Sequence, residues 1–145
     1  MVALCILIQR GEHAVMKLSK TTEYAIRILH YLYSYEHKEE VLTAQMISQA
    51  TNMTYPYFIK VASQLREKGY ITSTQGRHGG YQIARLNHKI TVYDVVLAME
   101  GDIQISTIPG VKAQCSMQKY FDQVREVVVD TLSKQYVADF SVIQY

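Results

Sequence analysis

The segment that decides the fold is TYPYFIKVASQLREKGYITSTQGRHGGYQIA, residues 54–84. Its first half carries apolar residues at helical spacing and stops at Gly69, a residue type that commonly follows the last turn of a helix. β-branched and aromatic residues follow at 70–74 and 81–84, on either side of a glycine-rich turn. The segment therefore predicts a helix followed directly by a β-hairpin. The predicted inward face of this helix is Phe58, Val61, Ala62 and Leu65.

Two further helices are predicted upstream of this segment. Ser19 is placed to cap a long first helix that ends near Tyr35, and Thr43 is placed to cap a short second helix. Residues 51–53 make a tight turn into the third helix, which begins at Thr54. A short helix, a turn, a second helix and a hairpin follow each other in this order in a winged helix-turn-helix. The predicted buried face of the short helix is Met46, Ile47 and Ala50.

The second half of the chain predicts two more helices. Thr91 caps a helix at 92–100 that breaks at Gly101, a loop covers 102–114, and the last helix covers about 116–135. The last helix has an apolar stripe that needs a partner. This stripe consists of Tyr120, Phe121, Val124, Val127, Val128 and Leu132.

The predicted fold class is mainly α with a small β-hairpin wing, in one compact domain. Residues 16–90 form the winged helix-turn-helix, and residues 91–145 form an effector loop and a long C-terminal helix. We interpret residues 1–15 as a translated leader ahead of a natural start at Met16, because convincing regular structure begins only there. The apolar stretch 1–8 is far shorter than the roughly 20 residues that span a bilayer.

Charge is distributed unevenly along the chain, although the net charge is only +2. Residues 16–90 carry ten Lys/Arg against five Glu, whereas residues 91–145 carry four Lys/Arg against seven Asp/Glu. A basic first half suits a module that faces the phosphates of duplex DNA. Chance asymmetry on solvated faces is the alternative interpretation.

Candidate DNA contacts follow from the geometry of a winged helix-turn-helix. The second helix of the pair enters the major groove, so its exposed N-terminal residues reach base edges, thymine methyl groups or phosphates. At the hairpin tip, Arg77 can reach a narrow minor groove; the alternative is a solvated charge on a plain hairpin. For Tyr57 the alternative is core packing. The candidates are Lys20, Thr43, Thr54, Tyr55, Tyr57, Ile59, Lys60, Gln75, Arg77 and His78.

Several motifs resemble one family of bacterial regulators. Met16-Lys17-Leu18-Ser19, Leu65-Arg66-Glu67-Lys68-Gly69 and the wing Gly76-Arg77-His78-Gly79-Gly80-Tyr81-Gln82-Ile83-Ala84-Arg85 resemble the IscR/NsrR/CymR family, and the likeness runs to about Tyr136. The resemblance implies a dimeric winged-helix repressor or activator whose long C-terminal helix pairs across a two-fold axis. It would thereby supply the partner for the apolar stripe. Gln75 departs from the arginine that members commonly carry before the first wing glycine.

The resemblance also implies an iron-sulfur cluster, which many members hold with three cysteines in the loop before the last helix. This chain has only Cys115 in that region, so we expect no cluster. A cluster held by Cys115 with help from a partner subunit, through a residue such as Glu23, is the alternative. Cys115 is also a candidate redox sensor, for which the alternative is an inert, half-buried thiol.

The sequence contains no phosphate loop, nucleophile elbow or metal-ligand pair at helical spacing, so we expect no enzyme. Two distant cysteines give no disulfide framework, which favours the reducing cytoplasm. We therefore predict a sequence-specific DNA-binding transcription regulator, a repressor, that acts as a homodimer on a palindromic operator. Its signal is an unidentified small-molecule or redox effector, and no membrane is involved. A winged-helix protein-interaction module without DNA binding is the alternative.

Overall fold

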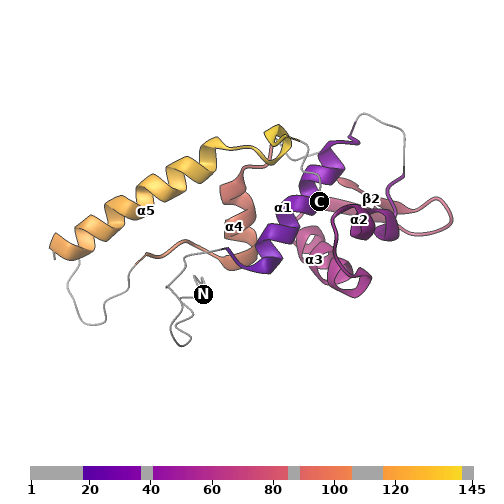
Figure 1. The fold of residues 1–145 in the computed structure, drawn as a ribbon, viewed down its shortest axis with the longest axis horizontal. Coiled ribbons are helices and arrows are strands. Elements are labelled where there is room, and N and C mark those ends of the chain that lie inside the picture. Colours follow the sequence, from indigo (N-terminus) through magenta and orange to yellow (C-terminus); the bar gives the residue numbers. More distant parts are fainter. Residues whose placement is uncertain (1–17, 37–40, 85–88, 106–115, 142–145) are drawn as a thin grey trace.

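The computed structural model describes residues 18–36, 41–84, 89–105 and 116–141 (Figure 1). Within these ranges the chain is mainly helical with one two-stranded antiparallel sheet, as predicted. Arg85, Cys115, the predicted leader and most of the predicted effector loop lie outside the described residues. The elements are α1 (Lys20–Tyr33), α2 (Ala44–Ala50), α3 (Tyr55–Glu67), β1 (Ile71–Thr74), β2 (Gly80–Ile83), α4 (Val92–Glu100), α5 (Ser116–Lys134) and the 3-10 helix η1 (Val137–Asp139).

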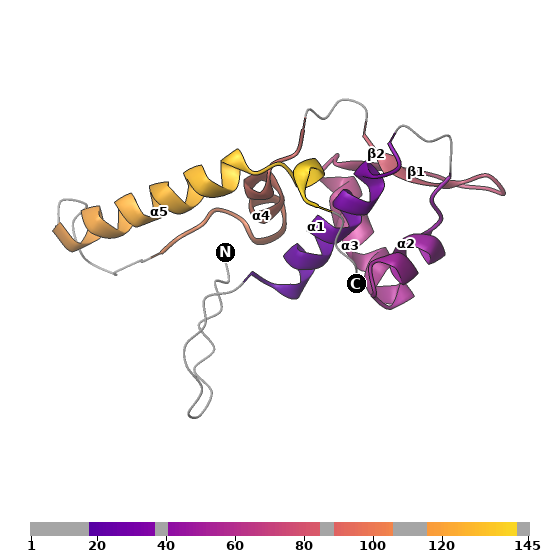
Figure 2. The ribbon, with the colours of Figure 1, turned by 45° about the horizontal axis from the view of Figure 1, so that its top comes forward.

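Helix α1 lies at the centre of the fold, between the helix-turn-helix and α4 (Figure 2). The Ser19 hydroxyl accepts the Thr22 N–H at 3.2 Å and so begins the helix, as predicted. Apolar residues spaced by three and four form one stripe that is at most 2% exposed. Helices α3 and α4, strand β2 and η1 all pack against α1. The buried stripe of α1 is Ala25, Ile28, Leu29 and Leu32.

Helices α2 and α3 form the helix-turn-helix pair. The Thr43 hydroxyl caps α2 by accepting the Met46 N–H at 3.3 Å. In the turn, the Thr51 hydroxyl donates to the Ile47 carbonyl at 2.6 Å, and Asn52 adopts a left-handed φ of 52°. The predicted inward face of α3 is confirmed, because each of its four residues is at most 1% exposed.

The predicted buried face of α2 is wrong at one position. Met46 is 42% exposed, whereas Ile47 and Ser48 are buried and Ala50 is half-buried. A helix of seven residues contains fewer than two full turns, so periodicity barely distinguishes its two sides. Met46 therefore contributes apolar surface and not core.

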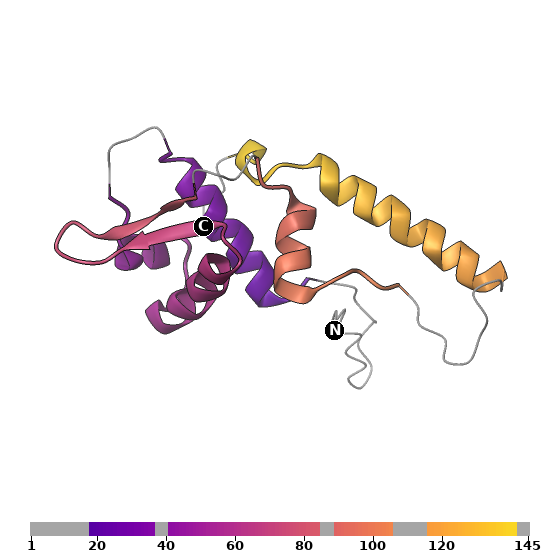
Figure 3. The same ribbon diagram turned by 180° about the vertical axis from the view of Figure 1, so that it is seen from behind.

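The hairpin β1–β2 is the predicted wing, and it is fixed at its base. Ile71 pairs with Ile83, and both are buried. The Tyr81 N–H donates to the Leu42 carbonyl at 2.9 Å, which ties β2 to the segment before α2. The Tyr81 ring meets Phe58 of α3 edge to face. Figure 3 shows the hairpin at one end of the molecule and α5 at the other.

Among the C-terminal elements, α4 and η1 pack on α1, and α5 packs on α4. Thr91 and Asp94 form a capping box that begins α4. The Val137 N–H donates to the Ile90 carbonyl at 2.9 Å, which brings the chain after α5 back to the start of α4. Helix α5 itself has no fully buried residue. None of the helices in the described ranges is long and apolar enough to cross a membrane.

A buried carboxylate joins α4 to the start of α1. Glu100 Oε1 accepts the Ser19 N–H at 2.8 Å and the Thr22 hydroxyl at 2.5 Å. Glu100 is 9% exposed, and its Oε2 has no hydrogen-bond partner among the described residues. A negative charge at a helix N-terminus is favourable because the first N–H groups and the helix dipole point at it. Glu100 thus fixes the end of α4 against α1.

We predict that Glu100→Ala lowers the free energy of unfolding by about 1–3 kcal/mol, because it leaves a buried N–H and hydroxyl without an acceptor. Glu100→Gln keeps one oxygen acceptor and should lose less. Glu36→Ala, which removes an exposed carboxylate, is the control and should change stability by less than about 0.5 kcal/mol. Urea unfolding at one fixed protein concentration measures all three, and equal midpoints for Glu100→Ala and Glu36→Ala would contradict the prediction.

Candidate nucleic-acid interface

The first two turns of α3 present an exposed face, which we call the reading face and define as Thr54, Tyr55, Ile59 and Lys60. Tyr55 is 53% exposed and Ile59 38%, and Thr54 and Lys60 are exposed too. The opposite side of α3 is the buried face described above, so helical periodicity directs these side chains away from the core. Thr54 precedes α3 without a side-chain capping hydrogen bond, unlike Ser19, Thr43 and Thr91 at their helices.

Tyr57 lies differently from the other candidates on α3. It is half-buried, and its hydroxyl lies 3.0 Å from the Thr21 hydroxyl of α1. Its ring meets the Tyr24 ring edge to face, with the centroids 5.3 Å apart. These contacts match the core-packing alternative, since they hold α3 against α1.

The wing tip, residues 75–78, is exposed throughout, so Gln75, Arg77 and His78 stand on the surface. The glycines that follow have a structural explanation. A Cβ on Gly79 would lie 2.1 Å from the Thr74 carbonyl oxygen, and a Cβ on Gly80 would lie 2.6 Å from the Leu42 carbonyl oxygen. The Gly-Gly pair therefore makes the tight turn and the close approach of β2 to Leu42, while the side chains of the tip remain available for a ligand.

The two remaining candidates, Lys20 and Thr43, are exposed at the starts of α1 and α2. Thr21 contacts Tyr57 of α3, and Lys20 is the residue before Thr21, so the backbone of Lys20 lies near α3. Thr43 follows Leu42, which bridges to Tyr81 of the wing. Its hydroxyl is already occupied as the cap of α2. The structure thus gathers the candidates around α3 and the wing.

Helix α5 has two apolar faces. Val128, Val129 and Leu132 pack against the core of their own chain. A second face, which we call the apolar seam, has the spacing three, four, three and is left uncovered by the described residues: Met117 is 49%, Tyr120 62% and Val127 66% exposed. The members of the seam are Met117, Tyr120, Val124 and Val127. The single predicted stripe is therefore divided: Tyr120, Val124 and Val127 belong to the seam, Val128 and Leu132 pack on their own chain, and Phe121 lines a cavity beside Arg125. The spacing of the seam is that of helix pairing.

The junction between α4 and α5 is polar. Arg125 donates from Nη2 to both carboxylate oxygens of Asp102, at 2.6 and 2.7 Å, and from Nε to the Ile103 carbonyl at 2.7 Å. The hydrogen bond from Arg125 lowers the pKa of Asp102, and the same contact raises the pKa of Arg125. The pair ties the segment after α4 to α5.

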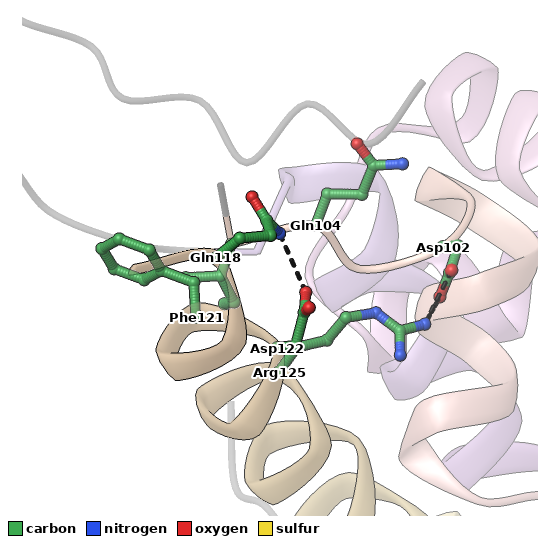
Figure 4. Close-up of a pocket in the computed structure, with 7 residues that line it drawn as sticks. Asp102, Gln104, Gln118, Phe121, Asp122 and Arg125 are labelled. Carbon is green, nitrogen blue, oxygen red and sulfur yellow. Dashed lines mark hydrogen bonds and ion pairs between the residues drawn. The ribbon is translucent and has the colours of Figure 1, made fainter. Parts of the chain in front are cut away.

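A cavity of about 250 Å³ lies beside this junction (Figure 4). Gln118 donates to Asp122 at 2.9 Å across one turn of α5, while Gln104 projects from the segment after α4. Asp122 and the amides give the wall hydrogen-bonding groups for a small polar molecule. The cavity is lined by Asp102, Gln104, Ile105, Gln118, Phe121, Asp122 and Arg125.

Few residues of this chain could serve as ligands for a metal ion or an iron-sulfur cluster. No group of three or more His, Cys, Asp or Glu that could hold a metal lies within the described part of the chain. Glu23 is exposed in the first turn of α1, and Cys115 lies outside the described residues. The complete sequence has only two cysteines, Cys5 and Cys115. This donor set falls short of the cysteines that iron-sulfur clusters normally require.

Sequence reasoning missed three features of this surface and its support. Periodicity places Met46 in the core, the helix predicted at 92–100 ends at Glu100 with no contact expected for its carboxylate, and no spacing predicts the contact between Thr21 and Tyr57. The burial of Glu100 could have been predicted, because Val92, Val96 and Glu100 lie at intervals of four and so share the buried side of α4. A hydroxyl pair between two helices has no such local pattern.

Comparison with known proteins agrees with the fold. The family described as Rrf2, iron-dependent transcriptional regulator, matches residues 18–142. The protein rrf2 of Nitratidesulfovibrio vulgaris is 39% identical over 85 residues, which cover 59% of this chain and 56% of that protein. The transcriptional repressor NsrR of Streptomyces coelicolor is 22% identical over 129 residues, covering 86% of this chain and 87% of that protein.

The solved structure of CymR, the global cysteine regulator of Bacillus subtilis, superposes with a TM-score of 0.75 at 23% identity. It covers 88% of this chain and 100% of that one, and at this identity it shows the same fold. The family match spans the helix-turn-helix, the wing and α5. The chain therefore belongs to the Rrf2 family of winged-helix transcriptional regulators.

Proposed function

We propose that the protein is a sequence-specific DNA-binding repressor that acts as a homodimer on a palindromic operator. The observation that carries the proposal is the reading face, which stands exposed next to an exposed wing tip on one helix-turn-helix. A recognition helix of this kind inserts its N-terminal residues into the major groove. Repression, rather than activation, follows the Streptomyces coelicolor relative, which is named a repressor.

The candidate residues make different kinds of contact with DNA. Lys20 and Lys60 are point charges that neutralise phosphates without reading sequence. Arg77 extends from the wing tip into an adjacent minor groove, where a narrow groove has enhanced negative potential. Thr54, Gln75 and His78 add hydrogen bonds at the edges of the contact. The Thr43 hydroxyl caps α2, so Thr43 contacts a phosphate through its exposed backbone at the start of that helix.

The apolar seam of α5 supplies the dimer contact. Its spacing is that of a helix that pairs with a copy of itself, and Met117, Tyr120 and Val127 are exposed in the single chain while Val124 is half-buried. Two-fold pairing places two recognition helices in successive major grooves, roughly 34 Å apart. A two-fold dimer requires an operator with the same symmetry, so the site is an imperfect palindrome.

Regulation acts at the α4–α5 junction. The cavity beside Asp102 and Arg125 can take a small polar effector, and that effector acts on the ion pair that ties the two elements. A coupling of only about 1–3 kcal/mol changes DNA affinity about 5- to 150-fold. The alternative sensor, Cys115, remains a sequence prediction. The family description is iron-dependent, but one cysteine in the loop region does not make the usual cluster donor set.

No enzymatic activity is part of the proposal, because the exposed candidates form a contact surface and not an acid-base or nucleophile arrangement. We place the protein in the cytoplasm, where its DNA target lies.

The binding function predicts a salt-sensitive affinity that depends on Arg77. Full-length protein is titrated onto the duplex upstream of its own gene and onto an unrelated duplex at two salt concentrations, with fluorescence anisotropy as the readout and iron content measured on the same sample. Arg77→Ala should weaken binding and reduce the salt slope by about one phosphate contact per protomer. Lys134→Ala removes an exposed charge from the end of α5 and should change neither. Equal, salt-independent binding to both duplexes would favour the protein-interaction alternative.

Tyr57 positions α3, and this role makes a separate prediction. Tyr57→Phe and Thr21→Val each break the hydroxyl pair and should lower the free energy of unfolding by about 0.5–1.5 kcal/mol. The double variant should lose little more than one single variant, because both remove the same bond. If Tyr57→Phe weakens DNA binding at unchanged stability while Thr21→Val does not, Tyr57 contacts DNA directly.

The dimer proposal predicts that Val127→Glu yields a monomer. A charge at a position that is apolar and 66% exposed in the single chain disrupts the seam without entering the core. Lys119→Glu, at an exposed position on the same helix but off the seam, is the control and should remain dimeric. Light scattering after size exclusion distinguishes the monomer mass of 16.7 kDa from twice that mass. A Val127→Glu protein that stays dimeric places the interface elsewhere.

A further inference from the structure

The reading face is unusual in being apolar at its centre. Tyr55 and Ile59 lie one helical turn apart and are 53% and 38% exposed. Single exposed hydrophobic residues are ordinary on protein surfaces. These two, however, occupy the first two turns of the helix that the proposed function inserts into the major groove. Their exposure therefore places apolar surface where base edges are read.

The polar residues that usually read bases are scarce in this part of α3. Arginine or lysine pairs with guanine through two hydrogen bonds, and asparagine or glutamine pairs with adenine in the same way. Residues 54–63 contain no Arg, Asn or Gln, and they contain no Asp or Glu that could accept from cytosine. Lys60 is the one charged residue of this stretch, and Tyr57 is turned toward α1. Apart from Lys60, which the proposed function assigns to a phosphate, these two turns have no residue type that reads a base through two hydrogen bonds.

One feature of the major groove suits an apolar reader. Thymine presents its C5-methyl group there, and neither cytosine nor the purines present an equivalent methyl group. A branched aliphatic side chain and an aromatic ring gain by burying that methyl, whereas they leave the polar edge of a G·C pair without partners.

We propose that Tyr55 and Ile59 read thymine methyl groups, so that each operator half-site carries thymines under the first two turns of α3. The inference rests on the proposed function, because it requires α3 in the major groove. Ile59 is the main specificity-determining residue, since its branched aliphatic side chain has no hydrogen-bonding group. Lys60 contributes affinity that is tolerant of sequence.

The experiment begins with the full-length chain and a pool of random duplexes, from which bound sequences are selected. In the selected consensus, each thymidine is then replaced by deoxyuridine, which removes the C5-methyl group and keeps base pairing. Each methyl in contact should weaken binding about fourfold, the factor that corresponds to burial of one carbon group. Positions outside the α3 footprint serve as internal controls.

Variants assign the methyl contacts to residues. Ile59→Ala should bind more weakly and lose the sensitivity to deoxyuridine at one position, while Ile59→Val, which keeps a branched aliphatic group, should retain most of it. Leu97→Ala removes a comparably exposed aliphatic residue from α4 and should keep the full sensitivity. Thermal melts of the free proteins confirm that each variant is folded.

The outcomes separate this proposal from the function on which it rests. A selected consensus that is bound tightly but has G·C pairs under α3, or that tolerates deoxyuridine everywhere, overturns the thymine proposal and leaves DNA binding intact. Equal deoxyuridine sensitivity in Ile59→Ala and the parent also overturns it. A pool that yields no enriched sequence, with no salt-sensitive binding, overturns both.

Discussion

The buried stripe of α1 is the contact on which the rest of the structure depends. Four aliphatic residues, each at most 2% exposed, face α3, α4, β2 and η1 from one helix. Burying a Leu or Ile side chain contributes about 1.5–3 kcal/mol, so the three larger residues of this stripe contribute an amount comparable to the net stability of a small domain. The helix-turn-helix, the wing and the C-terminal elements thus pack around the same helix.

Helix α5 stands outside this arrangement. It has no fully buried residue, and it attaches to its own chain through Arg125 and a few half-buried apolar residues. The surface that anchors α5 and the apolar seam occupy different sides of the helix. Folding of the chain and pairing of two chains can thus use separate residues, so a seam substitution need not disturb the core.

Much of this fold is predictable because its signals are local. The caps at Ser19, Thr43 and Thr91 and the inward face of α3 depend on residues three or four positions apart, which the sequence displays directly. Met46 was misplaced because seven residues carry little periodicity. The reading face was predicted by the same periodicity that identified the core of α3, since the outward side is its complement.

The features that escaped prediction connect distant parts of the chain. Glu100 and Ser19 are 81 residues apart, and Thr21 and Tyr57 are 36 apart. Such contacts depend on how whole helices pack, and no spacing rule contains that information. The division of the α5 stripe into two faces has the same origin, because only the position of α4 determines which residues are covered.

The position of Glu100 constrains how a signal can reach the reading face. Residues 100–103 are bound on two sides: Glu100 to the start of α1, and Asp102 and Ile103 to α5 through Arg125. The Asp102–Arg125 pair is half-exposed, and exposed ion pairs contribute little to stability, so this pair is the more easily broken of the two attachments. The buried bonds of Glu100 have the magnitude that regulation requires, about 1–3 kcal/mol. Under the proposed regulation, a movement of α5 would reach the reading face through Glu100, because Glu100 binds Ser19 and Thr22, and the neighbouring Thr21 contacts Tyr57 of α3.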